Sequence, residues 1–175
     1  MPTIPSPTTY LSFLRDRCKC IRSVTHAHTF IHEHFPLHHF LCDFLIMTLA
    51  KCGAIDASLQ MMSSSLQDEY KLSIFSWTSA ISACAGCGRS SEALELHNLM
   101  LTHGVEPDKY TFVSLFKACA KAMNLEEGKR LHDVAGQQRP SVVSDVFVCN
   151  SLISMYGKCG ACHEAEEVFL SMPSH

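Results

Sequence analysis

One pattern of fourteen residues occurs three times in this chain. Residues 40–53 and 147–160 are identical at seven of fourteen positions, and both copies end in Lys-Cys-Gly. A third copy occupies residues 75–88, so the later copies start 35 and 107 residues after the first one. A pattern with a period of this length is typical of helical repeat arrays, in which each unit stacks on its neighbours to bury a shared core.

The repeat spacing divides the whole chain into units. A fourth copy begins at Tyr110, and a poorer version of it begins at Tyr10. We therefore predict a leader at 1–8 and a degenerate repeat at 9–38. Four further units follow: 39–73, with an irregular connector at 63–72, then 74–108, 109–145 and an incomplete 146–175.

Each unit is expected to form two helices. In 74–108, apolar residues follow helical spacing over 75–85, at Trp77, Ala80, Ile81 and Cys84. Gly86 and Gly88 are expected to end this helix, and Ser90 or Ser91 to cap a second helix over 92–103. No segment alternates strictly between apolar and polar residues. The prediction is an all-α fold, a right-handed α-solenoid of about five helix-turn-helix repeats.

Composition limits the function classes. Apolar residues make up 47% of the chain and charged residues 18%, with a net charge of −3. A negative balance opposes nucleic-acid binding, because phosphate contacts favour basic surfaces. Residues 1–9 have neither a basic nor an apolar region typical of a secretion signal, and the apolar stretch 40–50 is too short to span a bilayer. We expect a protein in a reducing environment.

Ten cysteines raise the question of a metal site. The pairs Cys84–Cys87 and Cys159–Cys162 have zinc-ligand spacing. However, Cys52, Cys87 and Cys159 share the fourteenth position of the pattern, so packing between helices explains them more simply. We predict that these three are buried or half-buried without metal, and we expect no metal and no cofactor.

Two other groups of residues have competing interpretations. Six histidines between positions 26 and 39 could bind metal, but a solvated helix and loop are the simpler expectation. Trp77 could stack on a ligand, yet it shares its repeat position with Cys42 and Cys149, which predicts a core residue.

Several segments resemble the plant pentatricopeptide repeat family, in the subclass that alternates standard, long and short repeats. Residues 146–160 resemble the short repeat almost residue for residue. Residues 112–119 followed by 125–132 resemble the long type, and 90–96 with 104–108 resemble the standard type. The resemblance covers about residues 9–175, and residues 9–73 depart from it most.

The resemblance implies single-stranded RNA as the partner, read at one base per repeat by two or three side chains. In unit 74–108 it assigns Phe75 to stacking on the base, and Thr78 with Asp108 to selecting guanine. Phe75 and Thr78 are three residues apart and share a helix face. The same mapping assigns Tyr110, Val113 and Asp145 in the long unit, Phe147 and Asn150 in the last, and Phe40, Asp43 and Ser73 in 39–73.

The resemblance also implies a role in organellar RNA processing (editing, splicing or stability), in a mitochondrion or chloroplast. Relatives with a deaminase domain carry H-x-E followed by P-C-x-x-C, and this chain lacks that motif. We expect no enzyme, with a separate deaminase or other processing factor as a possible partner. The alternatives are a protein-interaction scaffold and a non-functional truncated family member.

The last unit ends at His175, before its closing residue. The helix expected over 164–172 then lacks a covering repeat. We predict that its apolar face, including Val168 and Phe169, is exposed and promotes self-association.

Overall fold

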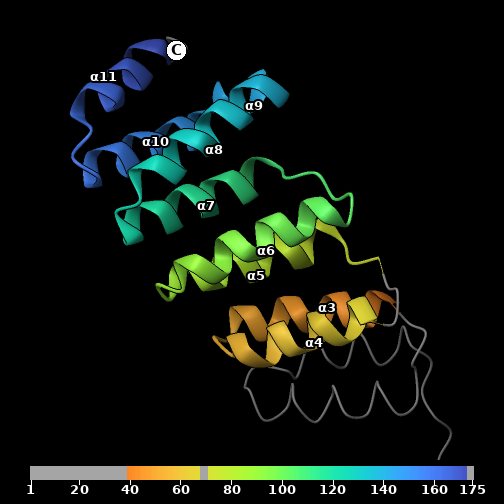
Figure 1. The fold of residues 1–175 in the computed structure, drawn as a ribbon. Coiled ribbons are helices and arrows are strands. Elements are labelled where there is room, and N and C mark those ends of the chain that lie inside the picture. The colour runs from red at the N-terminus through yellow and green to blue at the C-terminus, as the bar shows by residue number, and fades with distance from the viewer. Residues whose placement is uncertain (1–38, 68–70, 173–175) are drawn as a thin grey trace, which may run out of the picture. The chain divides into compact units, whose positions relative to one another are not determined.

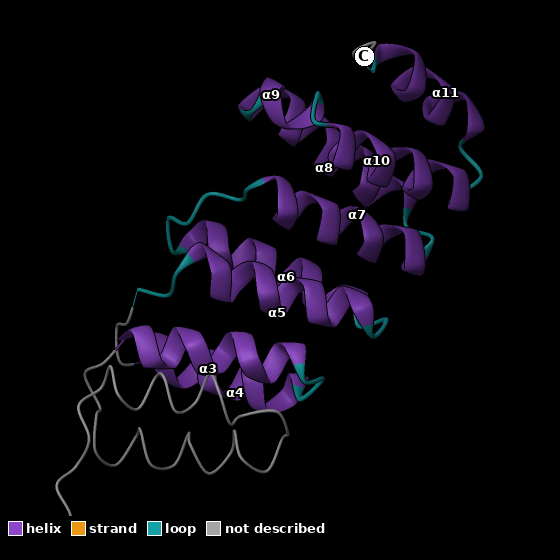
Figure 2. Ribbon diagram, turned by 180° about the vertical axis from the view of Figure 1, so that it is seen from behind, coloured by secondary structure: helices purple, strands orange, loops and turns teal. Residues whose placement is uncertain are grey.

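The computed structural model of this protein describes residues 39–67 and 71–172. Within these residues every regular element is a helix and there is no strand (Figure 2). The predicted all-α class is therefore confirmed. The predicted leader and first unit, and the histidines at 26–38, lie outside the described residues, as does the side chain of His39.

The chain divides into two compact units between Ala83 and Cys84. The first contains α3 (His39–Lys51), α4 (Ile55–Gln67) and most of α5 (Ile74–Gly86). The second contains α6 (Ser90–Thr102), α7 (Lys109–Ala122), α8 (Leu125–Gln138), the single turn α9 (Pro140–Val143), α10 (Val146–Lys158) and α11 (Cys162–Ser171), as Figure 1 shows. Part of the predicted connector is helical, because α4 continues through 63–67.

Neighbouring helices pack as hairpins within each unit. In the first unit α3 lies against α4, and in the second α7 contacts α6, α8 and α10, while α10 also contacts α8 and α11 (Figure 1). Helix α7 is therefore the central helix of the second unit.

The buried faces of α3, α5 and α10 keep one register. Trp77 is 0% exposed, Cys42 6% and Cys149 1%, which confirms that this shared repeat position lies in the core. The other predicted core residues of α5 are also buried, namely Ala80, Ile81 and Cys84. Because one helix face recurs with the repeat, its apolar positions could be read from the sequence.

The same hydrogen-bonded turn ends each of these helices. After α10, Gly160 adopts a φ of 76°, its N–H donates to the Gly157 carbonyl at 3.2 Å, and the Ala161 N–H donates to the Tyr156 carbonyl at 2.9 Å. Gly53 and Gly88 have φ of 77° and 81° and form matching bonds. Glycine recurs here because the left-handed conformation is strained for other residues.

The turn corrects the prediction about the recurrent cysteines. Cys52 and Cys159 are half-buried, but Cys87 is exposed, so the prediction is wrong for Cys87. Cys87 follows the end of α5 and directly precedes the left-handed Gly88, in a turn and not on the packed helix face. The Lys-Cys-Gly recurrence thus reflects this turn more than packing between helices.

Two boundary predictions around this turn also need correction. Gly86 is the last residue of α5, and only Gly88 takes a positive φ. The N-cap position of α6 is held by Arg89, with no side-chain cap. Ser90 is instead buried, and its hydroxyl donates to the Ala118 carbonyl of α7 at 2.9 Å. A side-chain bond between helices has replaced the expected cap.

The end of α11 agrees with expectation in part. Phe169 is 65% exposed, as predicted, whereas Val168 is only 6% exposed. Val168 is buried because α11 packs against α10, which covers one side of the helix. Self-association through Phe169 stays a prediction.

Two glycines of α8 have opposite environments. A Cβ on Gly128 would lie 2.5 Å from Sδ and 2.8 Å from Cε of Met155, a side chain that is 0% exposed. A Cβ on Gly136 would meet no atom within 4 Å. Of these two glycines, only Gly128 lets a neighbouring side chain pack directly against the helix backbone.

We expect Gly128→Ala to lower the free energy of unfolding by about 1–2 kcal/mol, because Met155 must shift within a packed core. Gly136→Ala, the matched control in the same helix, should raise it by about 0.5–1 kcal/mol through helix propensity. Denaturant unfolding of both variants measures the difference. Equal effects would contradict this account of Gly128.

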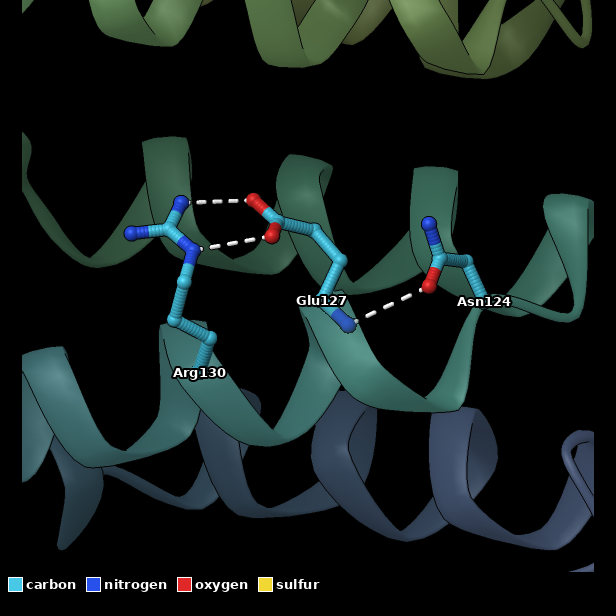
Figure 3. A network of polar contacts seen from close by, with 3 residues as sticks. All are labelled: Asn124, Glu127 and Arg130. Atoms are coloured by element: carbon cyan, nitrogen blue, oxygen red, sulfur yellow. Dashed lines mark hydrogen bonds and ion pairs between the residues drawn. The ribbon is translucent and has the colours of Figure 1, made fainter.

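A capped, charge-paired first turn begins α8. The Asn124 side chain accepts the Glu127 N–H at 3.2 Å, and Arg130 donates to both carboxylate oxygens of Glu127 at 2.8 and 2.5 Å (Figure 3). The hydrogen bonds from Arg130 lower the pKa of Glu127. These contacts fix the helix start and place two charged groups close to a buried histidine of α6.

That histidine is His97, which is 1% exposed and lies against the Phe112 ring of α7 at 6.4 Å between centroids. Neither of its ring nitrogens has a hydrogen-bond partner among the described residues. Burial lowers the pKa of His97, the Arg130 charge lowers it further, and Glu127 partly opposes both. The buried ring is therefore neutral at pH 7.

We expect stability to fall as the pH drops below about 6.5, the ordinary pKa of histidine. In that range the unfolded chain takes up a proton that the buried His97 resists, so acid favours unfolding. His97→Leu should make the free energy of unfolding less dependent on pH. It should also raise that free energy by about 1 kcal/mol at pH 7, since it removes unpaired buried nitrogens. Denaturant midpoints from pH 5 to 8 provide the measurement, and parallel slopes would refute it.

Candidate nucleic-acid interface

Three aromatic side chains are exposed at the first turn of a helix. Phe75 of α5 is 65% exposed, Tyr110 of α7 60% and Phe147 of α10 69%. We call them the first-turn aromatic residues. Each occupies the second position of its predicted unit and is also the second residue of its helix. The helix face that buries the core points the other way, so the repeat itself directs these rings to solvent.

In the second unit a lysine lies close to both rings. Lys109 Nζ is 5.4 Å from the centroid of Tyr110 and 5.9 Å from that of Phe147. The same ammonium donates to Asp145 Oδ2 at 2.8 Å. Tyr110 and Phe147 therefore flank one charged contact between α7 and the start of α10.

The predicted selecting residue Asp145 also caps α10. Its Oδ1 accepts the Phe147 N–H at 2.9 Å. The hydrogen bond from Lys109 is the main reason that the pKa of Asp145 is lowered, and Asp145 in turn raises the pKa of Lys109. The carboxylate is thus ionised at neutral pH and engaged at both oxygens.

Asp108, the selecting residue predicted for unit 74–108, caps α7 in a capping box. Its Oδ1 accepts the Thr111 N–H at 2.8 Å and the Thr111 hydroxyl at 2.9 Å, while the Asp108 N–H donates to the Thr111 hydroxyl. The capping box fixes the Asp108 side chain at the helix N-terminus. Thr78, its predicted companion, is half-buried on α5.

The remaining predicted site residues vary in accessibility. Asn150 is exposed and Val113 is half-buried. Asp43 accepts the Ser76 hydroxyl at 2.6 Å and the Ser73 N–H at 3.1 Å, so this carboxylate ties α3 to the start of α5. The side chain of Phe40 lies outside the described residues.

Sequence reasoning missed Lys109. The signal was present, because Lys109 directly precedes a first-turn aromatic residue and lies 36 residues before Asp145. The equivalent first positions of the neighbouring units are Ile74 and Val146, which are apolar. A cation at this position is therefore particular to unit 109–145 among the three.

The described cysteines are core or turn residues, except Cys162, which is exposed at the start of α11. Cys42, Cys84, Cys119 and Cys149 are buried, and burial raises the pKa of Cys119 to about 12. Within 39–67 and 71–172, no three His, Cys, Asp or Glu side chains lie close enough together to hold a metal ion. None of the described helices has the length and apolarity needed to cross a membrane.

Family models match the region that carries this geometry. Residues 72–121 match the model described as PPR repeat family, and residues 110–134 and 147–175 match the model described as PPR repeat. Together these matches cover more than half of the chain.

Similar proteins are much longer than this chain. A chloroplastic pentatricopeptide repeat-containing protein of Arabidopsis thaliana is 64% identical over 31 residues, which cover 18% of this chain and 4% of the relative. The maize pentatricopeptide repeat protein PPR10 has 18% identity and a TM-score of 0.71, over 95% of this chain and 23% of PPR10.

A second structure of PPR10, in complex with an 18-nucleotide psaJ RNA element, has a TM-score of 0.79 at 16% identity, over 98% of this chain and 26% of PPR10. The likeness shows a shared helical solenoid fold. The repeat matches and this fold identify the chain as a member of the pentatricopeptide repeat (PPR) family.

Proposed function

We propose that this chain is a sequence-selective, single-stranded RNA-binding module. The observation that carries the proposal is the exposure of Phe75, Tyr110 and Phe147 at one repeat position. Exposed aromatic rings stack on nucleobases, and every base has a face that can accept such a contact. The structure of PPR10 with an RNA element supports the same class of ligand.

Base selection is proposed to come from the polar residues assigned by family resemblance. In unit 74–108 these are Thr78 and Asp108, and the expected base is guanine. An ionised aspartate accepts hydrogen bonds and donates none. Guanine offers N–H donors on its Watson–Crick edge, so the two groups are complementary. The capping box holds the Asp108 carboxylate in one orientation, which favours a defined contact.

The net charge of −3 affects how RNA would bind. Few phosphates can be neutralised, so stacking and base-edge contacts must supply most of the affinity. The salt dependence of binding should accordingly be shallow, because it follows the number of phosphate contacts. The same negative charge favours the second candidate function, a protein-interaction scaffold.

We propose further that the protein acts in organellar RNA processing, with a separate factor supplying any catalysis. The chloroplastic relative supports a chloroplast. A mitochondrial location follows only from the general family resemblance. The described residues offer binding side chains at the interface, so the proposal is for recognition and not for a reaction.

The test changes one selecting residue. Thr78→Asn should move the preference of unit 74–108 from guanine toward a pyrimidine, because an amide donor suits a pyrimidine carbonyl. The loss of guanine preference should be about 1–3 kcal/mol. Competition binding with single-stranded RNAs that differ at one nucleotide measures the ranking of the four bases.

Ser82→Asn is the matched control, because Ser82 is an exposed residue of the same helix, one turn beyond Thr78, and is not among the residues assigned to base contact. It should leave the ranking unchanged. The assignment of Thr78 fails if Thr78→Asn and the unaltered protein rank the bases alike. If neither binds single-stranded RNA above duplex DNA at moderate salt, the scaffold function replaces RNA binding.

A further inference from the structure

Unit 109–145 differs from unit 74–108 in the state of its selecting carboxylate. Asp145 Oδ1 accepts the Phe147 N–H at 2.9 Å and Oδ2 accepts Lys109 Nζ at 2.8 Å. Both oxygens therefore have donors. Each oxygen can accept a second hydrogen bond, but a base edge that donates side by side to both oxygens must compete with Lys109 at Oδ2 and with the Phe147 N–H at Oδ1.

The position of Lys109 makes displacement by a base difficult. Its ammonium lies within 6 Å of the centroids of both Tyr110 and Phe147, so two ring faces stabilise the cation in addition to the carboxylate. If the base stacks on these rings, as the proposed function requires, it enters the surroundings that the ammonium already occupies.

The contact is not explained by a large contribution to folding. The Lys109 and Asp145 side chains are 37% and 22% exposed, so water screens their attraction. Asp145 would still cap α10 through Oδ1 without the lysine. Asp108 of unit 74–108 has a different arrangement from Asp145. Both hydrogen bonds in its cap use one oxygen, Oδ1, and both donors come from Thr111.

We propose that Lys109 is a specificity-determining residue that blocks base selection by Asp145. Unit 109–145 then binds its nucleotide by stacking, with little preference among the bases. This inference rests on the proposed RNA-binding function and adds to it a position at which the protein tolerates sequence variation in its target.

The neighbouring units supply the comparison that supports this inference. Their first residues are Ile74 and Val146, which carry no charge that could reach a carboxylate. A single change at Lys109 should therefore convert a tolerant unit into a selective one. Guanine is the expected base, because its N1–H and N2–H groups can donate side by side to a carboxylate.

The experiment compares Lys109→Gln with the unaltered protein in binding to single-stranded RNA pools randomised at each position in turn. Lys109→Gln should gain a guanine preference of about tenfold at one nucleotide. Lys109→Arg keeps the charge and should behave as the unaltered protein.

Two controls separate this effect from a change in fold or charge. Lys117→Gln removes an exposed lysine from the same helix and should create no base preference. Lys109→Gln combined with Asp145→Asn should lose the new guanine preference. Asparagine still caps a helix, so the double variant keeps the start of α10.

The outcomes distinguish the two proposals. If the single variant binds RNA with the same base ranking as the unaltered protein, the role of Lys109 is refuted and RNA binding stands. If a guanine preference appears but survives Asp145→Asn, Asp145 is not the group that Lys109 blocks and the inference is also overturned. If the unaltered protein binds no RNA, the proposed function fails and the inference with it.

Discussion

Replacing Phe116 with alanine should lower the free energy of unfolding by about 3–5 kcal/mol, the largest effect that we expect from a single substitution. Phe116 is 0% exposed and stacks on Phe112, with 6.2 Å between ring centroids. Its helix, α7, contacts α6, α8 and α10. The cavity would therefore open at the centre of the second unit, where surrounding helices cannot easily close it.

Such a loss is a large share of the stability of a small domain, which is typically about 5–15 kcal/mol. Denaturant unfolding followed by circular dichroism gives the measurement. Phe147→Ala is the matched control, since it removes the same side chain from a position that is 69% exposed. It should change stability by no more than about 0.5 kcal/mol. Similar losses in both variants would mean that the core is not where we place it.

Phe147→Ala should have its effect on RNA instead. Stacking contributes about 1–3 kcal/mol per base, so affinity for single-stranded RNA should fall about 5- to 150-fold. Tyr110→Ala should act similarly. Because stacking does not depend on base identity, the ranking of RNAs that differ at one nucleotide should stay the same while all of them weaken.

The control for this second prediction is Phe169→Ala. Phe169 is 65% exposed on α11, so it matches Phe147 in residue type and accessibility but lies outside the repeated first-turn position. RNA affinity should not change. If Phe169→Ala weakens binding as much as Phe147→Ala, general stickiness and not the repeated aromatic position accounts for the interaction.

Much of the fold could be predicted from the sequence because one apolar register recurs with the period. Trp77, Cys42 and Cys149 share a repeat position and are all buried. Cys87 was misassigned for a physical reason: a residue just before a left-handed glycine belongs to the turn, and the turn can face solvent while the helix before it is packed.

The state of the interface could be predicted less well. The repeat pattern indicates which residues share a face, and the exposure of Phe75, Tyr110 and Phe147 agrees with it. It does not indicate which polar groups are already hydrogen-bonded. The contact between Lys109 and Asp145 joins residues 36 positions apart, about one repeat, but the repeat spacing alone does not show that the two side chains meet. Their partnership depends on packing between α7 and α10.

The double role of Asp108 and Asp145 restricts how target preference can change during evolution. Each side chain caps a helix and also occupies a proposed base-selecting position, which Lys109 blocks in the case of Asp145. Asparagine, serine and threonine can replace aspartate at a cap with little cost, whereas alanine costs about 0.5–2 kcal/mol. Exchange among this small set of polar residues alters the donors and acceptors offered to RNA while the helices keep their starts. The base preference of a repeat can therefore change while the stability of the protein stays nearly constant. The requirement for a helix cap limits which residues can occupy the selecting position, and so limits which base preferences can arise.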